Sequence, residues 1–356
     1  MTAATLFGHA MRLHRLHPDE PLPRDGYPFP DDDLHSGRRL PASDDHRRAG
    51  AAVAVILDAH FARPHAPPSA LNGAFHDVYV PIHRNEHIVA AALRADADRV
   101  RQAGRWLVRH GTDRCSATVG LALLATGWDA EDIPLIQTIG LLSNHFGPLA
   151  VDALARRPRN GSQTLLWLAQ RVAGWGRVYV VEALCRYGVD DDQRHWLLRH
   201  ACDGDYLNSY FAERLATVGH LYEAITSAAV DDELIAHTGR LLLAMADAGG
   251  MGATLESYPP AAAVLARHAE LFGGLAPTAQ RYLTVALLAD RLERRPPEKS
   301  GCDDEGRDRL VLEYLAVLNR PEWCAVIHDD RETHPEFLEW FVPEVAMRLG
   351  LRAFSR

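Results

Sequence analysis

RWLVRHGTD, from Arg105 to Asp113, and HWLLRHACD, from His195 to Asp203, align without a gap at an offset of 90 residues, and this repeat decides the fold. Both copies carry a tryptophan, an arginine, a histidine and an aspartate at matching positions. Further on, Leu-Ala-Thr occurs at 124–126 and again at 215–217, each time with a glycine within two residues. In each copy we therefore expect a helix, a turn whose aspartate caps the next helix, and a second helix that ends near the glycine.

Such a pair of helices cannot bury its apolar face alone, so pairs of this kind stack on their neighbours. An offset of 90 residues holds two units of about 45 residues, which lies within the range of HEAT and armadillo repeats. The sequence therefore predicts an all-α fold, an α-α superhelix of the HEAT or armadillo kind. The alternative is a chance similarity between two amphipathic helices in a chain rich in arginine and leucine.

A longer run carries a resemblance. GWGRVYVVEALCRYGVDDDQRHWLLRHACDGDYLNSY, from Gly174 to Tyr210, resembles bacterial HEAT-like repeat proteins of uncharacterised role. The resemblance extends over residues 96–225 and implies an α-α superhelix. It brings no catalytic residue that could be carried over to this chain.

Three regions are predicted along the chain. Residues 1–48 form an N-terminal arm, a short helix followed by an irregular segment rich in Pro and Asp, in which Tyr27 and Phe29 offer aromatic anchors. Residues 49–294 hold the HEAT-like helical repeats, and the first well-defined helix is expected over 51–61. A loop with Pro and Gly and a group of helices fill residues 295–356 and close the solenoid.

Within the repeat region, glycine and proline punctuate the helical pattern. The spacing of Leu207, Phe211 and Leu215, together with Tyr210 and Val218, predicts one buried helical face. The segment RVYVV at 177–181 is the best candidate for a strand, but it fits a helical stripe and we assign it to a helix. Helix ends or breaks are expected at Gly111, Gly127, Gly147, Pro158, Gly174, Gly188, Gly219 and Gly273.

Charge and cysteine usage narrow the class of protein. The net charge is −9, which argues against an extended phosphate-binding surface. Net charge does not report how charge is distributed, so nucleic acid stays open as a partner through a local basic groove. The five cysteines include no CxxC pair, which favours a reduced compartment over disulfides or a zinc site. With neither a secretion signal nor a membrane span in the pattern, we expect a cytoplasmic protein.

Polar and aromatic side chains of neighbouring helix pairs are expected to converge in the concave groove of the superhelix. Arginine can fork onto a carboxylate or phosphate, and aromatic rings offer flat contact area. The competing interpretation is an ion-pair network, such as Arg177 with Glu182, that only ties adjacent repeats together. We expect no catalytic residue, no metal site and no cofactor. The predicted binding cluster consists of Trp175, Arg177, Glu182, Asp205, Asn208, Tyr210 and Glu213.

These features favour a non-enzymatic scaffold whose concave face binds a protein or peptide. One alternative is a DNA-lesion enzyme of the alkylpurine-glycosylase type, whose HEAT-like architecture resembles the one predicted here. It would use Trp175, Trp196, Tyr210 and Asp205 at the lesion, and Arg156, Arg157 and Arg159 on phosphates. A second alternative is a Mg-dependent helical enzyme, because Asp205, Ser209 and Glu213 resemble a magnesium motif of terpene synthases.

Overall fold

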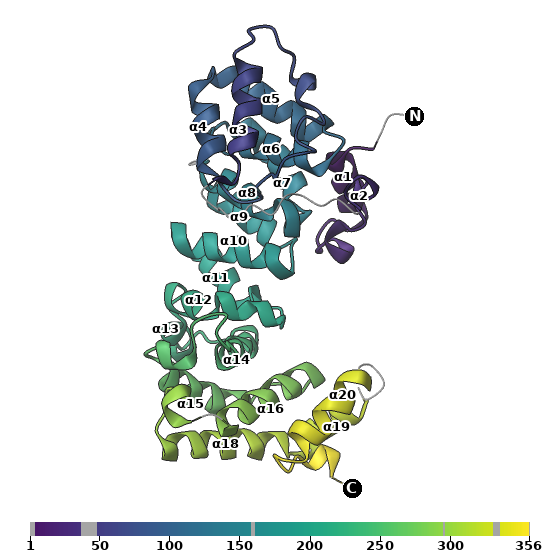
Figure 1. The fold of residues 1–356 in the computed structure, drawn as a ribbon. Helices are drawn as coiled ribbons and strands as arrows, with labels where there is room; N and C mark the ends of the chain where they lie inside the picture. Colours follow the sequence, from purple (N-terminus) through teal and green to yellow (C-terminus); the bar gives the residue numbers. More distant parts are fainter. Residues whose placement is uncertain (1–3, 37–47, 158–160, 295, 330–334, 356) are drawn as a thin grey trace. The chain divides into compact units, whose positions relative to one another are not determined.

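The fold is all-α, as the sequence predicts. The structure, a computed structural model, describes residues 4–36, 48–157, 161–294, 296–329 and 335–355, and these ranges hold helices and no strand (Figure 1). In the same ranges, none of the helices has both the length and the apolar composition that crossing a bilayer requires. Contacts between residues divide the chain into two compact units, 1–187 (unit 1) and 188–356 (unit 2). The division falls inside the predicted repeat region 49–294.

Unit 1 is built from helices and short 3₁₀ segments. The segment 177–181 belongs to one of these helices, which confirms the assignment made above. The bounds are α1 (Leu6–Leu16), η1 (Pro23–Gly26), α2 (Asp32–His35), α3 (Ala51–Phe61), η3 (Pro68–Leu71), α4 (Glu86–Arg94), α5 (Ala97–His110), α6 (Arg114–Leu124), η4 (Ala130–Asp132), α7 (Ile133–Gly140), α8 (Ser143–Ala155), α9 (Gly161–Ala169) and α10 (Gly174–Tyr187).

Unit 2 is likewise built from helices and short 3₁₀ segments, with one π-helical segment. Its bounds are α11 (Asp191–His200), η5 (Tyr206–Tyr210), α12 (Ala212–Val218), α13 (Leu221–Thr226), α14 (Asp232–Ala246), η6 (Leu255–Ser257), α15 (Ala261–Phe272), α16 (Ala279–Arg294), α17 (Pro297–Ser300), α18 (Asp304–Leu318), α19 (Pro321–Asp329), α20 (Pro335–Phe341), the π-helical η7 (Val342–Ala346) and η8 (Arg352–Phe354).

The first copy of the repeat forms the predicted helix pair. RWLVRH ends α5, and Asp113 caps α6, because its side chain accepts a hydrogen bond from the backbone N–H of Ser116 (2.9 Å). In both copies the tryptophan ring contacts the ring of the histidine four residues later, at 5.4 Å for Trp106 with His110 and 6.4 Å for Trp196 with His200. The two first helices of the repeat therefore share their local geometry.

The second copy departs from the prediction after its first helix. Asp203 does not cap an α-helix; its carboxylate accepts from the backbone N–H of Asp205 (3.1 Å) and from Nδ2 of Asn208 (3.0 Å). Gly204, at φ +97°, turns the chain, and Asp205 caps η5 instead. The single helix expected over 207–218 is wrong, because η5 and α12 share that span and Phe211 between them has φ −122° and ψ −9°.

Close crossings of helices explain two glycines inside helices. A Cβ on Gly120 of α6 would lie 2.6 Å from Leu107 Cβ and 3.0 Å from the carbonyl oxygen of Gly104 in α5. Gly147 was expected to end a helix, yet it lies inside α8, where a Cβ would meet the ring of Tyr179 at 3.2 Å. That prediction was wrong because the glycine serves the crossing of α8 with α10. Pro158, another expected break, and residues 37–47 of the predicted arm lie outside the described residues.

Two aspartates near the start of unit 1 cap helices that lie far along the chain. Asp25 accepts from the backbone N–H (2.9 Å) and the hydroxyl (2.6 Å) of Ser143, the first residue of α8. Asp31 accepts from the backbone N–H of Arg114, the first residue of α6 (2.6 Å), and from its guanidinium Nη2 (3.0 Å). Phe29 is buried between these contacts, with the guanidinium of Arg114 over its ring. Because the first N–H groups of a helix lack partners within it, this segment completes both helices.

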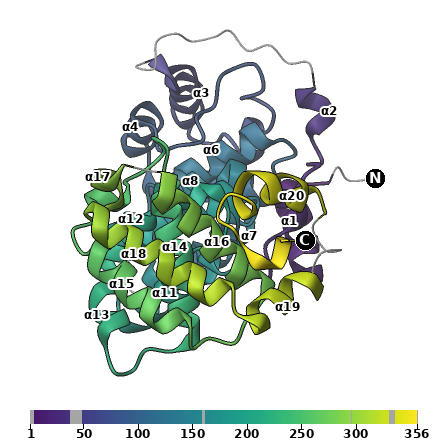
Figure 2. The ribbon, with the colours of Figure 1, turned by 90° about the horizontal axis from the view of Figure 1, so that it is seen from below.

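In unit 2 the long helices pack side by side in chain order. α14 contacts α16, and α16 contacts α18, so the three form a row, while α13 contacts α15 and α15 contacts both α14 and α18 (Figure 2). Leu242 of α14, Leu288 of α16 and Tyr314 of α18 are fully buried in the core. Such layering of successive helices is compatible with the α-α superhelix that the repeat predicts.

Candidate functional site

The seven predicted binding residues fall into two groups. Trp175, Arg177 and Glu182 lie on α10 in unit 1, whereas Asp205, Asn208, Tyr210 and Glu213 lie in unit 2.

In unit 1, the aromatic and charged groups of α10 serve the fold to different degrees. Trp175 is 36% exposed and stacks on Tyr179 one turn later, with the ring centres 6.0 Å apart. Arg177 is buried, and its Nε donates to the carbonyl oxygen of Val172 (3.0 Å), which ties the turn before α10 to the helix. Glu182 is half-buried. The pKa of Tyr179 is raised, first because its hydroxyl is buried and second because of the negative charge of Glu182. The exposed indole is the part of this group that faces solvent.

In unit 2, a short polar turn over 203–209 holds the second group in place. The Asp205 side chain accepts from the backbone N–H of Leu207 (2.9 Å) and starts η5. Asn208 is buried and bridges the turn, because its Oδ1 accepts from Gly204 N–H while its Nδ2 donates to Asp203. The hydroxyl of Ser209 donates to the carbonyl oxygen at position 244 in α14 (2.9 Å). This turn is fastened both to itself and to the neighbouring helix.

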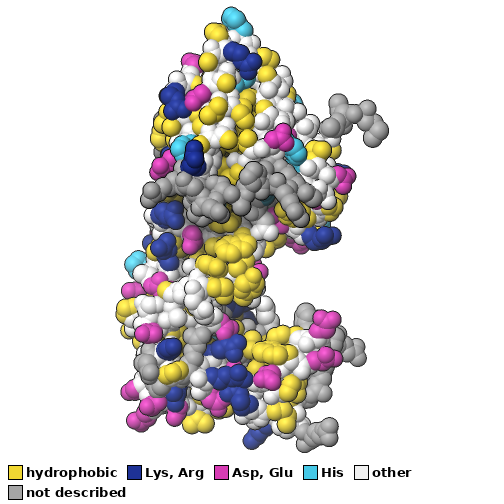
Figure 3. Space-filling model, in the orientation of Figure 1, with side chains coloured by type: hydrophobic (Ala, Val, Ile, Leu, Met, Phe, Trp, Pro, Cys, Tyr) yellow, Lys and Arg dark blue, Asp and Glu magenta, His cyan; other side chains and the backbone are white. Residues whose placement is uncertain are grey.

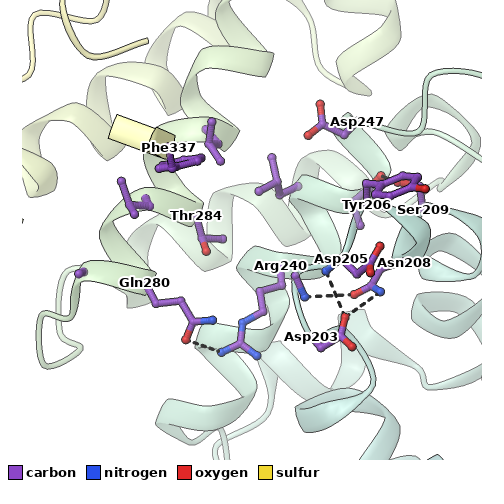
Figure 4. A pocket seen from close by; sticks show the side chains of 16 residues that line it. Asp203, Asp205, Tyr206, Asn208, Ser209, Arg240, Asp247, Gln280, Thr284 and Phe337 are labelled. Atoms are coloured by element: carbon purple, nitrogen blue, oxygen red, sulfur yellow. Dashed lines mark hydrogen bonds between the residues drawn. The ribbon is translucent and has the colours of Figure 1, made fainter. Parts of the chain in front are cut away.

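The turn forms one wall of a pocket of about 750 Å³ within unit 2. Figure 4 shows Gln280 and Thr284 of α16 on one side, the 203–209 turn on the other, and Arg240 of α14 between them. Apolar side chains of the two helices and Phe337 of α20 complete the lining. The lining residues outside the 203–209 turn, none of them predicted from the sequence, are Arg240, Leu243, Ala244, Asp247, Ala279, Gln280, Leu283, Thr284, Leu287 and Phe337.

Charge in the pocket is mainly negative. Three carboxylates line it, those of Asp203, Asp205 and Asp247, against one guanidinium, that of Arg240. Asp247 is paired with Arg291, so Asp203 and Asp205 supply most of the negative charge. Arg240 donates from Nη1 to the carbonyl oxygen of Cys202 (3.2 Å) and from Nη2 to Oε1 of Gln280 (3.4 Å). Its pKa is lowered, chiefly because burial removes water from the guanidinium. The guanidinium thus holds α14, α16 and the turn together, and the carboxylates set the sign of the pocket.

The missed residues follow a helical stripe that the sequence does contain. Gln280, Leu283, Thr284 and Leu287 are spaced at 0, 3, 4 and 7 along α16, so they share one face. A mixed polar and apolar stripe of this kind is a signal for a helix face that lines a groove. It carries no information on which other helix lies opposite, so Phe337 could not be found from it.

The magnesium motif does not form. Asp205, Ser209 and Glu213 would share a face only on one continuous α-helix, but they lie on the cap of η5, on η5 and on α12. Glu213 accepts a hydrogen bond from the hydroxyl of Thr217 on its own helix (3.0 Å). Among the described residues, no group of three or more His, Cys, Asp and Glu side chains could hold a metal ion. Neither Tyr210 nor Glu213 lines the pocket.

Two of the three arginines proposed for DNA phosphates, Arg156 and Arg157, form ion pairs inside unit 1. Arg157 is 1% exposed and lies 3.5 Å from the Asp132 carboxylate, and Arg156 pairs with Asp152 at 3.3 Å. Arg159 lies outside the described residues, and Trp196 is buried. On the face shown in Figure 3, Lys and Arg side chains are interspersed with Asp and Glu. The ion pairs argue against Arg156 and Arg157 as the phosphate contacts that a DNA-lesion enzyme needs.

With this geometry established, the chain was compared with known proteins. The comparisons with protein-family models, with curated proteins and with solved structures each gave no match.

Proposed function

We propose that the chain is a protein- or peptide-binding scaffold built as a HEAT-like superhelix, and that the pocket of unit 2 holds an extended segment of the partner with a basic side chain. The row of helices in unit 2 supports the superhelix. The carboxylates of the pocket carry the choice of a basic segment. None of the five cysteines, all of them in the described residues, forms a disulfide, which supports a cytoplasmic location.

The pocket combines the two features that recognition of an extended peptide uses. Leu243, Leu283, Leu287 and Phe337 give an apolar lining for the body of the segment. The carboxylates of the rim attract a lysine or arginine, and the half-buried ring of Phe337 can face its cationic group. The observation that carries the proposal is this combination of an apolar lining and a negative rim.

The test measures binding of a fluorescent peptide array to the full chain and to two variants. Asp205→Asn keeps the cap of η5, because Asn caps a helix as well as Asp does, but it removes a charge from the pocket. Asp303→Asn makes the same change at the cap of α18, outside the pocket, and serves as the matched control.

We expect peptides with a central Lys or Arg to be selected and to bind Asp205→Asn about fivefold more weakly, since a partly exposed charge pair contributes about 1 kcal/mol. Binding to Asp303→Asn should be unchanged. Selection of acidic peptides, equal loss in both variants, or binding of duplex DNA alone would contradict the proposal.

A further inference from the structure

Three residues of unit 1, Asp31, His35 and Cys115, lie in a row that the proposed scaffold function does not use. Nε2 of His35 lies 3.4 Å from Sγ of Cys115, and Nδ1 of the same ring lies 3.3 Å from Oδ2 of Asp31. Asp31 and His35 flank and end the short helix α2, whereas Cys115 is the second residue of α6. The fold therefore brings a carboxylate, an imidazole and a thiol together from 80 residues apart in the sequence.

The geometry fixes the tautomer of His35. Nδ1 faces two oxygens of Asp31, the carboxylate at 3.3 Å and the backbone carbonyl at 3.1 Å. Both are acceptors, so Nδ1 carries the proton and donates it. Nε2 is then the acceptor on the side of Cys115 and receives the S–H hydrogen. This arrangement of nucleophile, base and orienting group is the one that activates a thiol.

The carboxylate that orients His35 is held rigidly. Asp31 is 1% exposed and accepts from the backbone N–H and guanidinium of Arg114. Cys115 follows Arg114 in the first turn of α6, an 11-residue helix, where the helix dipole favours negative charge. Deprotonation of Cys115 is therefore favoured both by the imidazole that takes the proton and by the helix that faces the sulfur.

Other charged groups near the sulfur do not cancel this effect. Arg114 is positive and Asp32 pairs with it. The ring of His76 meets the ring of His35 edge-on, with the ring centres 5.4 Å apart. His145, on α8, is held neutral at pH 7, because burial lowers its pKa to about 4. Arg114 is thus the permanent positive charge beside the thiol, while the two aspartates are engaged with it.

We propose that Cys115 is a nucleophilic thiol, with His35 as its base and Asp31 as the positioning residue of that base, and that it is oxidised by peroxides. Cys115 is buried, at 6% exposed, and the His35 side chain is 15% exposed, so the site suits only an electrophile as small as a peroxide. Acyl transfer fits less well. The N–H of Arg114 already bonds Asp31 and that of Ser116 bonds Asp113, so neither of these amides remains for an oxyanion.

The proposed reaction is a two-electron oxidation of the thiol by a peroxide. The S–H proton of Cys115 passes to Nε2 of His35, and the thiolate attacks the terminal, hydrogen-bearing oxygen of ROOH. The S–O bond forms as the O–O bond breaks, and the leaving RO⁻ takes the proton from His35. Sulfur loses two electrons and becomes a sulfenic acid, while the peroxide is reduced to ROH.

The same chain supplies two internal reference thiols. Cys302 and Cys324 are more exposed than Cys115, and burial raises the pKa of each. Exposure alone would make them the faster thiols. The proposal reverses that order, because it attributes reactivity to the thiolate and not to access.

The experiment treats the full chain with hydrogen peroxide at pH 7, traps sulfenic acid with a dimedone probe, and reads each cysteine by mass spectrometry. We expect Cys115 to be labelled at least about tenfold faster than Cys302 and Cys324. The pH–rate profile for iodoacetamide should show a limb for Cys115 well below the ordinary thiol value of about 8.5.

Two variants separate the base from the scaffold. His35→Gln should remove the low-pH limb and bring Cys115 to the rate of the reference thiols, whereas His76→Gln, which changes a ring neighbour of His35, should leave the limb in place. Circular dichroism checks that both fold. If Cys115 in the unaltered protein reacts more slowly than Cys302, or titrates near 8.5, the proposal is overturned whether or not the variants fold.

Discussion

His268 shows what full burial does to a single titratable group. Its ring lies in the core of unit 2, 0% exposed, with Nδ1 2.8 Å from the hydroxyl oxygen of Tyr314. Burial lowers its pKa from 6.5 to about 4, because the charged imidazolium cannot be hydrated there. The neutral ring is therefore the form that the folded protein accepts.

This shift fixes the sign of a pH effect on stability. The unfolded chain takes up a proton near pH 6.5 and the folded chain only near pH 4, so the free energy of unfolding falls as pH drops through that window. The loss from His268 should reach roughly 3 kcal/mol at pH 4. Urea unfolding from pH 7 to pH 4 measures it.

The Asn side chain can hydrogen-bond Tyr314 in place of Nδ1 and does not titrate. We therefore expect His268→Asn to make the free energy of unfolding depend less on pH, with some loss of stability at pH 7. The control is His220→Asn, at an exposed residue with φ +55°, a conformation that Asn tolerates. If the free energy of unfolding of His268→Asn falls with pH as steeply as that of the unaltered protein, other groups cause the loss of stability in acid.

At the scale of single residues, the sequence predicts local roles better than partners. Asp113 was expected to cap a helix and does so. Asp203 occupies the matching position in the second copy of the repeat, but Gly204 and Asp205 after it allow a tighter turn, and the cap moves to Asp205. His35 and Cys115 were not singled out, because no pattern in a sequence relates a residue of the N-terminal arm to the start of α6.

Among the elements, helix existence was predictable, and helix crossings were not. The helix over 51–61 was confirmed residue for residue by α3. The prediction for Gly147 was wrong because the sequence alone does not distinguish a glycine that ends a helix from one that lets a second helix approach closely. Only the neighbour, here Tyr179 of α10, distinguishes the two roles.

The crossing of α5 with α6 can be tested by one methyl group. Gly120→Ala improves helix propensity by about 1 kcal/mol, but its Cβ would lie 2.9 Å from the backbone nitrogen of Val108, which cannot move alone. We expect a net loss of about 2 kcal/mol in the free energy of unfolding, because the helices must separate. Gly127→Ala is the control, since its Cβ would meet only the Leu124 carbonyl oxygen at 3.8 Å. A stabilised Gly120→Ala would mean that the crossing is looser than described.

For the whole molecule, the all-α class follows from periodicity and was confirmed within the described residues, whereas the two compact units were not foreseen. Helical stripes show that each helix buries a face, but every pair in a stack shows the same stripe. Nothing in that pattern marks residue 187 as the end of one unit. The superhelix itself stays a prediction.

Two compact units, each with its own buried core, should unfold in separate steps. We expect two transitions in denaturant, assigned to the units by hydrogen exchange with mass spectrometry. Gly120→Ala should shift the transition of unit 1 alone and His268→Asn that of unit 2 alone. A single transition that both variants shift equally would show that the units unfold together.

Asp25 caps α8 and Asp31 caps α6, so the order in which the chain is synthesised limits when these caps can form. These carboxylates leave the ribosome 118 and 83 residues before the amides they bind. At about 5–20 residues per second, the first interval alone lasts roughly 6 to 24 s. During that interval Asp25 cannot form its hydrogen bonds to Ser143. The caps of α6 and α8 can therefore form only after Arg114 and Ser143 have emerged, however early the helices of unit 1 pair with one another.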